Sequence, residues 1–201
     1  MDILSWLAVN FDLPILDWIA NNLYCDFLDM LMPIITMFGD AGIFWIACAV
    51  VLLIFPKTRK IGLSMGAALL LGVLICNVTM KPLIARVRPY DFQLEHFQKY
   101  IVLLVETPND YSFPSGHTIA SFEAATVLLV KNKKLGIPAM ILAVLIAFSR
   151  MYLYVHYPTD VLASVVLGII MAYLGMFLVD KLWALWERNR KGNKRKKVRR
   201  A

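Results

Sequence analysis

Residues 149–160 read SRMYLYVHYPTD, a polar turn that separates two long apolar runs. The run before the turn covers about residues 138–154, and the run after it covers about residues 159–182. A membrane-spanning helix needs roughly 20 mostly apolar residues to cross the hydrocarbon core of a bilayer. Because a backbone in lipid must satisfy its own hydrogen bonds, both runs are predicted to be helices. The quoted stretch therefore predicts a helical hairpin in a membrane.

The composition of the whole chain also predicts a membrane protein. Its 201 residues are 60% hydrophobic and have a mean hydropathy of +0.65, which is too apolar for a soluble domain of this length. We predict an all-α fold, a bundle of six transmembrane helices preceded by an amphipathic segment at residues 1–24. The six predicted spans cover about residues 27–38, 43–55, 61–84, 115–131, 138–154 and 159–182.

The formal net charge of +7 comes from the C-terminal tail. Residues 187–201 hold nine of the 21 Lys and Arg residues and one Glu, which leaves the rest of the chain at −1. A basic run directly after an apolar helix is typical of a cytoplasmic flank beside anionic lipid headgroups. No aromatic residues interleave with these charges, so no nucleic acid partner is expected. We predict one membrane-embedded domain at residues 1–186 and a basic cytoplasmic tail at residues 187–201.

The positions of Lys and Arg predict which side of the membrane each loop faces. Basic residues follow the second, fourth and sixth spans, where the positive-inside rule places the cytoplasm. A multi-pass protein of the plasma membrane with both termini in the cytoplasm is the expected topology. By elimination, residues 86–113 and 150–160 lie together on the extracytoplasmic face.

Lys81 and Arg88 are cations at the outer end of the third span. They are seven residues apart, so two helical turns would bring them to one face if the helix persists. Cations at a helix end often snorkel to the membrane interface, and this alone could explain them. However, the positive-inside rule predicts few positive charges on the outer side, so the pair is interpreted as the partner of an anion.

A second polar segment, FPSGH at residues 113–117, begins the fourth span. Ser115 is a good helix N-cap, and the N–H groups of Ser115, Gly116 and His117 would face outward, where the helix dipole favours an anion. Gly116 would let a phosphate approach the backbone closely. Taken alone, the segment could also be an ordinary capped helix with an interfacial histidine.

The turn at residues 149–160 adds an arginine, an imidazole and a carboxylate. Arg150 ends the fifth span, His156 lies in the turn, and Asp160 falls in the first helical turn of the sixth span. Asp160 could accept a hydrogen bond from one imidazole nitrogen and leave the other as a nucleophile. A His–Asp bond that only ties the turn together is the alternative, but it leaves Arg150 unexplained. Three cations, N–H donors and two histidines on one face predict a phosphate site.

The sequence predicts no metal and no other cofactor. It holds no carboxylate cluster and no HExxH pattern, so protein cations are expected to neutralise the phosphate charge. The polar loop between the third and fourth spans shows no headgroup pattern, and its charged residues are predicted to be solvated or to form a lid. These residues are Asp91, Glu95, His96, Lys99, Glu106 and Asp110.

The three polar segments resemble the three motifs of the type 2 phosphatidic acid phosphatase superfamily, which read K-x6-RP, PSGH and SR-x5-H-x3-D. The matches run from Lys81 to Pro89, from Pro114 to His117 and from Ser149 to Asp160. Order, spacing and span layout also agree, over about residues 40–180. The resemblance implies that His156 forms a phosphohistidine, that Asp160 orients its ring and that His117 protonates the leaving oxygen. It also implies a set of phosphate ligands, namely Lys81, Arg88, Ser115, Gly116 and Arg150.

The resemblance leaves the lipid substrate open. We predict undecaprenyl diphosphate, because an outward-facing site fits lipid carriers whose spent diphosphate appears on the outer leaflet, and a small single-domain chain resembles bacterial enzymes of this sort. The alternatives are phosphatidylglycerophosphate, phosphatidic acid, other isoprenoid diphosphates and lipid A phosphates. A non-catalytic phospholipid-binding or transport protein on this scaffold is a further alternative. Vanadate-dependent haloperoxidases share similar motifs, but such enzymes are soluble.

Overall fold

A computed structural model describes residues 3–198, and the side chains of residues 3–190. Every regular element in this range is a helix, which confirms the predicted all-α fold. The elements are α1 Ile3–Leu7, the π-helix η1 Ala8–Asp12, α2 Leu13–Leu23, α3 Asp26–Met37, the 3-10 turn η2 Asp40–Gly42, α4 Ile43–Ile54, α5 Arg59–Gly72, the π-helix η3 Val73–Met80, α6 Lys81–Ile84, α7 Pro89–Phe97, α8 Gly116–Lys131, α9 Lys133–Tyr152 and α10 Pro158–Val198.

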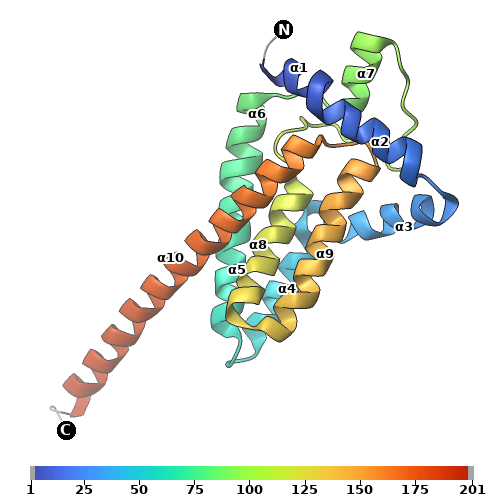
Figure 1. The fold of residues 1–201 in the computed structure, drawn as a ribbon. Helices are drawn as coiled ribbons and strands as arrows, with labels where there is room; N and C mark the ends of the chain where they lie inside the picture. The colour runs from blue at the N-terminus through green and yellow to red at the C-terminus, as the bar shows by residue number, and fades with distance from the viewer. Residues whose placement is uncertain (1–2, 199–201) are drawn as a thin grey trace.

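The helix α8 lies at the centre of a bundle with α4, α5, α9 and α10 (Figure 1). Residues 121–128 of α8 are all buried, as expected for a helix that has neighbours on every side. Small residues let the surrounding helices approach closely. A Cβ added at Gly175 of α10 would lie 2.7 Å from the backbone nitrogen of Ala68 in α5.

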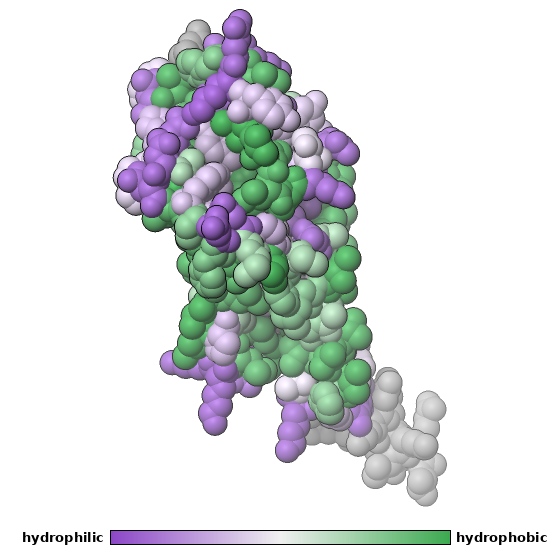
Figure 2. All heavy atoms as spheres, turned by 90° about the vertical axis from the view of Figure 1, so that its right-hand side faces the viewer, coloured by the Kyte–Doolittle hydropathy of each residue, from purple (hydrophilic) through white to green (hydrophobic). Residues whose placement is uncertain are grey.

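The apolar surface of the bundle fits a membrane. Figure 2 shows an apolar middle zone, with hydrophilic residues gathered toward the two ends. By length and composition, five helices of the described chain can cross a membrane, so the chain is a multi-pass membrane protein. The predicted count of six spans is not confirmed. One reason is α8, whose 16 residues fall short of the usual spanning length, although its burial inside the bundle keeps it out of lipid.

The residues of the predicted first span do not form a helix that runs along the bundle. Its residues form α3, which has only 12 residues, or about 18 Å of helix, and lies across the bundle in Figure 1. The preceding segment, α1 to α2, also lies across this end of the bundle and exposes Trp6, Phe11 and Trp18, in line with the predicted amphipathic segment.

The two ends of the described chain lie at opposite ends of the bundle (Figure 1). Neither end is placed relative to a membrane, so the cytoplasmic position of both termini stays a prediction. Part of the predicted tail at residues 187–201 continues α10, while residues 1–2 and 199–201 and the side chains of 191–198 lie outside the description.

The third span ends where the polar segment begins. α5, η3 and α6 form one continuous helical stretch that stops at Ala85, whose φ of 48° lies in the left-handed region. Arg88 is therefore not on the same helix as Lys81; it is the extended residue before Pro89, which starts α7. The two cations meet through this sharp change of direction rather than through helical spacing.

Candidate active site

A cavity of about 880 Å³ opens at the end of the bundle where the three polar segments meet. Its lining includes six of the eight predicted site residues, namely Lys81, Arg88, Gly116, His117, Arg150 and His156. The other two, Ser115 and Asp160, are fully buried behind it. The structure therefore brings together side chains from α6, the α6–α7 link, α8, α9 and the α9–α10 turn.

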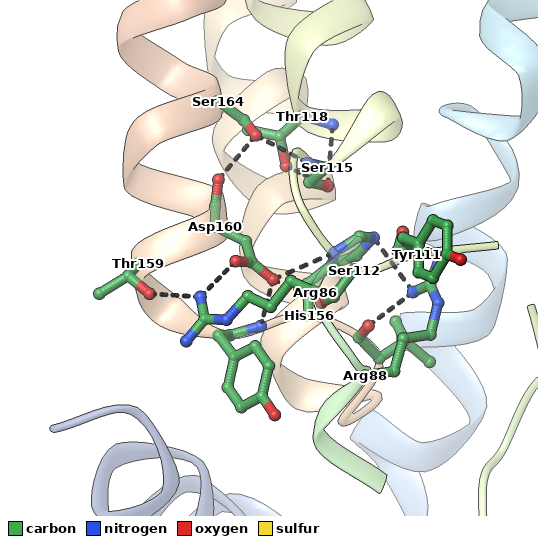
Figure 3. A network of polar contacts seen from close by, with 12 residues as sticks. Arg86, Arg88, Tyr111, Ser112, Ser115, Thr118, His156, Thr159, Asp160 and Ser164 are labelled. Atoms are coloured by element: carbon green, nitrogen blue, oxygen red, sulfur yellow. Dashed lines mark hydrogen bonds and ion pairs between the residues drawn. The ribbon is translucent and has the colours of Figure 1, made fainter. Parts of the chain in front are cut away.

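His156 lies in the turn between α9 and α10, where two cations and a carboxylate surround it (Figure 3). Its Nε2 atom is 3.4 Å from Nη1 of Arg88, and its Nδ1 atom is 3.7 Å from Oδ2 of Asp160. Burial, followed by the nearby charges of Arg88 and Arg150, holds the pKa of His156 well below its ordinary value. The imidazole is therefore neutral at pH 7, with Nδ1 toward Asp160 and Nε2 toward the cationic cavity.

Asp160 stands in the first turn of α10, and both of its oxygens are held (Figure 3). Oδ1 accepts a hydrogen bond from Nη1 of Arg86 at 2.5 Å. Oδ2 accepts bonds from the Ser112 hydroxyl at 2.5 Å and from the Tyr157 N–H at 3.2 Å. The carboxylate is thus held in one orientation, with Oδ2 facing the His156 ring.

The two arginines that line the cavity are held in different ways. Arg88 donates from Nη1 to the Val155 carbonyl at 2.6 Å, which ties it to the turn that carries His156. Arg150 donates from Nη1 to the Thr36 hydroxyl at 2.6 Å, and its buried Nε has no hydrogen-bond partner within the described chain. An arginine that lines a cavity with unused donors is suited to a ligand with several acceptor oxygens.

Asp110 occupies the place expected for a phosphate. Its carboxylate forms ion pairs with both Lys81 and Arg88, although the sequence had placed it among the solvated or lid residues of the loop. Burial alone would raise the pKa of Asp110, but hydrogen bonds from Lys81 and Arg88 outweigh burial and lower it to about 2. A substrate phosphate that binds these two cations must therefore displace an ionised carboxylate.

His117 stands in the first turn of α8 and pairs with an acid from the α3–α4 turn. Its Nε2 atom is 2.7 Å from Oδ1 of Asp40. Gly39 makes room for the imidazole, because an added Cβ would lie 2.6 Å from the ring atom Cδ2 of His117. The Asp40 carboxylate therefore holds the imidazole in one orientation at the wall of the cavity.

The start of α8 matches the predicted N-cap but not all of the predicted free donors. The Ser115 hydroxyl accepts a hydrogen bond from the N–H of Thr118 at 3.5 Å, as a capping side chain does. However, the Ser115 N–H donates to the Ser164 hydroxyl at 2.8 Å, so it is already paired. Gly116 lines the cavity, where a Cβ would lie 3.3 Å from Asn77.

Several residues of the site were not singled out in the sequence. The sequence assigned no role to Arg86, which follows the third predicted span, or to Asp12, which lies in the predicted amphipathic segment. Thr36 lies in the first predicted span, Asp40 follows the end of that span, and Ser112 lies in the polar loop. A signal existed for Arg86 alone, since it stands two residues before a motif arginine on the side where few cations are expected.

The chain resembles known proteins in sequence. Residues 61–184 match the PAP2 superfamily. An undecaprenyl-diphosphatase of Sulfolobus acidocaldarius is 37% identical over 150 residues, which cover 74% of this chain and 69% of that protein. Undecaprenyl-diphosphatase BcrC of Bacillus subtilis is 33% identical over 159 residues, 77% of each chain.

The fold has a similar counterpart among solved structures. A transmembrane PAP2-type phosphatidylglycerolphosphate phosphatase from Bacillus subtilis superimposes with a TM-score of 0.66 and 29% identity, over 89% of this chain and 90% of that one. The sequence match and the likeness of fold show that the chain is a membrane lipid phosphatase. It belongs to the PAP2 superfamily.

Proposed function

We propose that the protein hydrolyses undecaprenyl diphosphate through a phosphohistidine intermediate. The observation that carries this proposal is the position of His156, whose Nε2 faces the cationic cavity while Nδ1 faces the Asp160 carboxylate. The two relatives named as undecaprenyl-diphosphatases support the choice of substrate.

In the first step, Nε2 of His156 attacks the terminal phosphorus in line with the bridging oxygen. The P–N bond forms as the P–O bond to the lipid phosphate breaks, and His117 gives its proton to the departing oxygen. Asp160 stabilises the positive charge that develops on the His156 ring. Lys81, Arg88, Arg150 and the N–H of Gly116 stabilise the equatorial oxygens of the transferred phosphoryl group.

In the second step, water attacks the phosphohistidine. His117, which is now neutral, takes a proton from the water, and the P–N bond breaks to release inorganic phosphate and neutral His156. The residues that act in both steps are protein groups, so the mechanism proceeds without a metal ion. Phosphate release in the presence of EDTA tests this point.

The cavity is also suited to the lipid part of such a substrate. Its volume is within the usual range for a small-molecule site, and its lining includes Met37, Ile46, Leu69 and Val73 beside the charged residues. We propose that the phosphates bind at the Lys81 end and that the first part of the lipid chain contacts these apolar side chains.

We also propose that the site faces the extracytoplasmic side. The basic residues after α4 and α8 lie at the other end of the bundle, which the positive-inside rule assigns to the cytoplasm. Accessibility labelling of single cysteines at Glu106 and Lys133 in intact cells tests this assignment. Labelling of Lys133→Cys but not Glu106→Cys by an impermeant reagent would reverse it.

The substrate is tested by a phosphate-release screen with purified lipids in detergent. Undecaprenyl diphosphate is expected to have a higher kcat/KM than phosphatidylglycerophosphate, phosphatidic acid or lipid A phosphate. A clear preference for phosphatidylglycerophosphate would favour the alternative to which the solved structure points. Bound lipid without any turnover would favour the non-catalytic alternative.

Replacing Asp110 with asparagine is expected to strengthen phosphate binding. The substitution removes the charge that competes for Lys81 and Arg88, so the inhibition constant of inorganic phosphate should fall about two- to fivefold, the range of an exposed ion pair. The measurement is inhibition of lipid hydrolysis by added phosphate. Glu95→Gln, an exposed acid on α7, is the matched control and should change nothing. An unchanged constant in Asp110→Asn would contradict the competition.

We expect that protonation of His156 does not lower kcat/KM near pH 6.5. The pKa of His156 is lowered in the free enzyme, so its reactive neutral form persists as pH falls through the ordinary histidine range. The acid limb should therefore lie below pH 6.5, after correction for the separately titrated substrate. An enzyme ionisation at or above pH 6.5 that must be deprotonated for activity would show that His156 is not shifted.

A further inference from the structure

Arg86 lies between two buried carboxylates from distant parts of the chain. Its Nη1 donates to Oδ1 of Asp160 at 2.5 Å, and its Nη2 donates to Oδ2 of Asp12 at 2.7 Å. The guanidinium carbon also lies 3.9 Å from the centre of the Tyr157 ring. All three charged side chains are buried, at 5%, 0% and 0% exposure for Arg86, Asp12 and Asp160.

Asp12 closes this network around the start of α10. Its Oδ1 accepts a hydrogen bond from the N–H of Thr159 at 2.9 Å, and its Oδ2 accepts one from the Thr159 hydroxyl at 2.8 Å. The same hydroxyl accepts a bond from Nη1 of Arg86 at 2.8 Å (Figure 3). The first turn of α10, which carries Asp160, is therefore attached to η1 by both backbone and side chain.

The network controls the orientation of the carboxylate behind the nucleophile. Arg86 holds Oδ1 of Asp160, and this leaves Oδ2 directed at the His156 ring. The charges of Arg86, Asp12 and Asp160 sum to one negative charge. This net charge stabilises the positive charge that develops on His156 during attack. Without Arg86, two buried carboxylates would lose their shared cation, and Asp160 would lose a fixed orientation.

We propose that Arg86 and Asp12 are positioning residues that hold Asp160 against His156, so that the N-terminal segment is part of the catalytic apparatus. This rests on the proposed function, in which Asp160 orients the nucleophile. Asp12 lies outside the residues that match the superfamily, and neither residue contacts the cavity in which the phosphate would bind. Both should therefore act on the chemical step and not on phosphate affinity.

Kinetics of Arg86→Met, Arg86→Lys and Asp12→Asn, each alone and combined with Asp160→Asn, test the proposal. In the wild-type background, Arg86→Met and Asp12→Asn should lower kcat about 10- to 100-fold, as is usual for groups that orient a reacting residue. KM and the inhibition constant of phosphate should stay within about twofold. Arg86→Lys should recover little, because a lysine cannot bridge two carboxylates with separate N–H groups.

The combined variants show whether the effect passes through Asp160. In the Asp160→Asn background, Arg86→Met should lower kcat by less than about threefold, since residues that act through one another are not additive. An equal loss in both backgrounds would overturn the positioning proposal while leaving the proposed function intact. Unchanged turnover in Asp160→Asn itself would instead overturn the proposed role of the His156–Asp160 pair.

A matched control separates positioning from damage to the N-terminal segment. Asn10 lies in the same π-helix as Asp12, but among the described residues its exposed side chain bonds only to the carbonyl of Trp6, in its own segment. Asn10→Ala should keep wild-type kcat, and a loss equal to that of Asp12→Asn would overturn the proposal. Thermal unfolding in detergent is measured for every variant. If Arg86→Met does not fold, Asp12→Asn carries the test, because the amide keeps the size of the side chain.

Discussion

His156→Ala is expected to lower turnover of undecaprenyl diphosphate by more than about 10⁴-fold, the scale reached when a covalent nucleophile is removed. No other described side chain presents an imidazole beside both Arg88 and Asp160, so nothing replaces the lost attack. Phosphate release in detergent, with EDTA present throughout, gives the measurement. Wild-type protein should keep its activity in EDTA.

The same proposal predicts that the intermediate can be trapped. His117→Ala removes the acid of the first step and the base of the second, but a lipid phosphate can leave without an acid more readily than water can attack without a base. Labelled phosphate from the substrate should therefore remain on the protein in this variant. The label should be lost in acid and kept in alkali, as a phosphoramidate is. The double variant His117→Ala, His156→Ala should carry no label. Label that persists in the double variant, or turnover above about 1% in His156→Ala, would rule out His156 as the nucleophile.

Arg150→Ala is expected to lower kcat by about 10²- to 10³-fold with little change in the yield of folded protein. The guanidinium is buried at the cavity, bonds only to the Thr36 hydroxyl among the described residues and has no carboxylate within ion-pair distance there. Its charge is therefore free to stabilise the transferred phosphoryl group. Because removing a buried charge without an ion-pair partner costs little folding free energy, the fold should survive.

Two further variants make the Arg150 result specific. Arg150→Lys keeps the charge but loses the planar pair of donors, and should recover only part of the lost rate. Arg59→Ala removes an exposed arginine at the opposite end of α5, where Nε bonds to the Leu53 carbonyl, and should leave turnover unchanged. Wild-type turnover in Arg150→Ala would remove this residue from the site.

The arrangement of the site was predictable where each motif sits on one local element. Ser115 caps α8 because its side chain reaches an N–H three residues later, and the four-residue separation of His156 and Asp160 spans one turn and the start of a helix. Lys81 and Arg88 meet for a different reason than helical spacing. The chain leaves the helix at Ala85, and the common partner of the two cations is Asp110, which is distant in sequence.

The fold shows the same division between local and distant effects. Long apolar runs predicted the helices, because hydrophobicity and length are properties of each segment. The path of α3 across the bundle was not predictable in this way, since its apolar residues read like those of a short span. Its orientation depends on packing against α9, an element distant in the sequence.

By itself, the sequence determined that this protein is a helical membrane protein with the three phosphatase motifs, because apolar length, charge position and motif spacing can be read from neighbouring residues. Only the tertiary structure decided that Asp110 pairs with Lys81 and Arg88 and that Asp12 and Arg86 lie beside Asp160. A buried ion pair requires both partners to arrive at one place. For residues 74 positions apart, as Asp12 and Arg86 are, that place is set by helix packing and not by any local pattern.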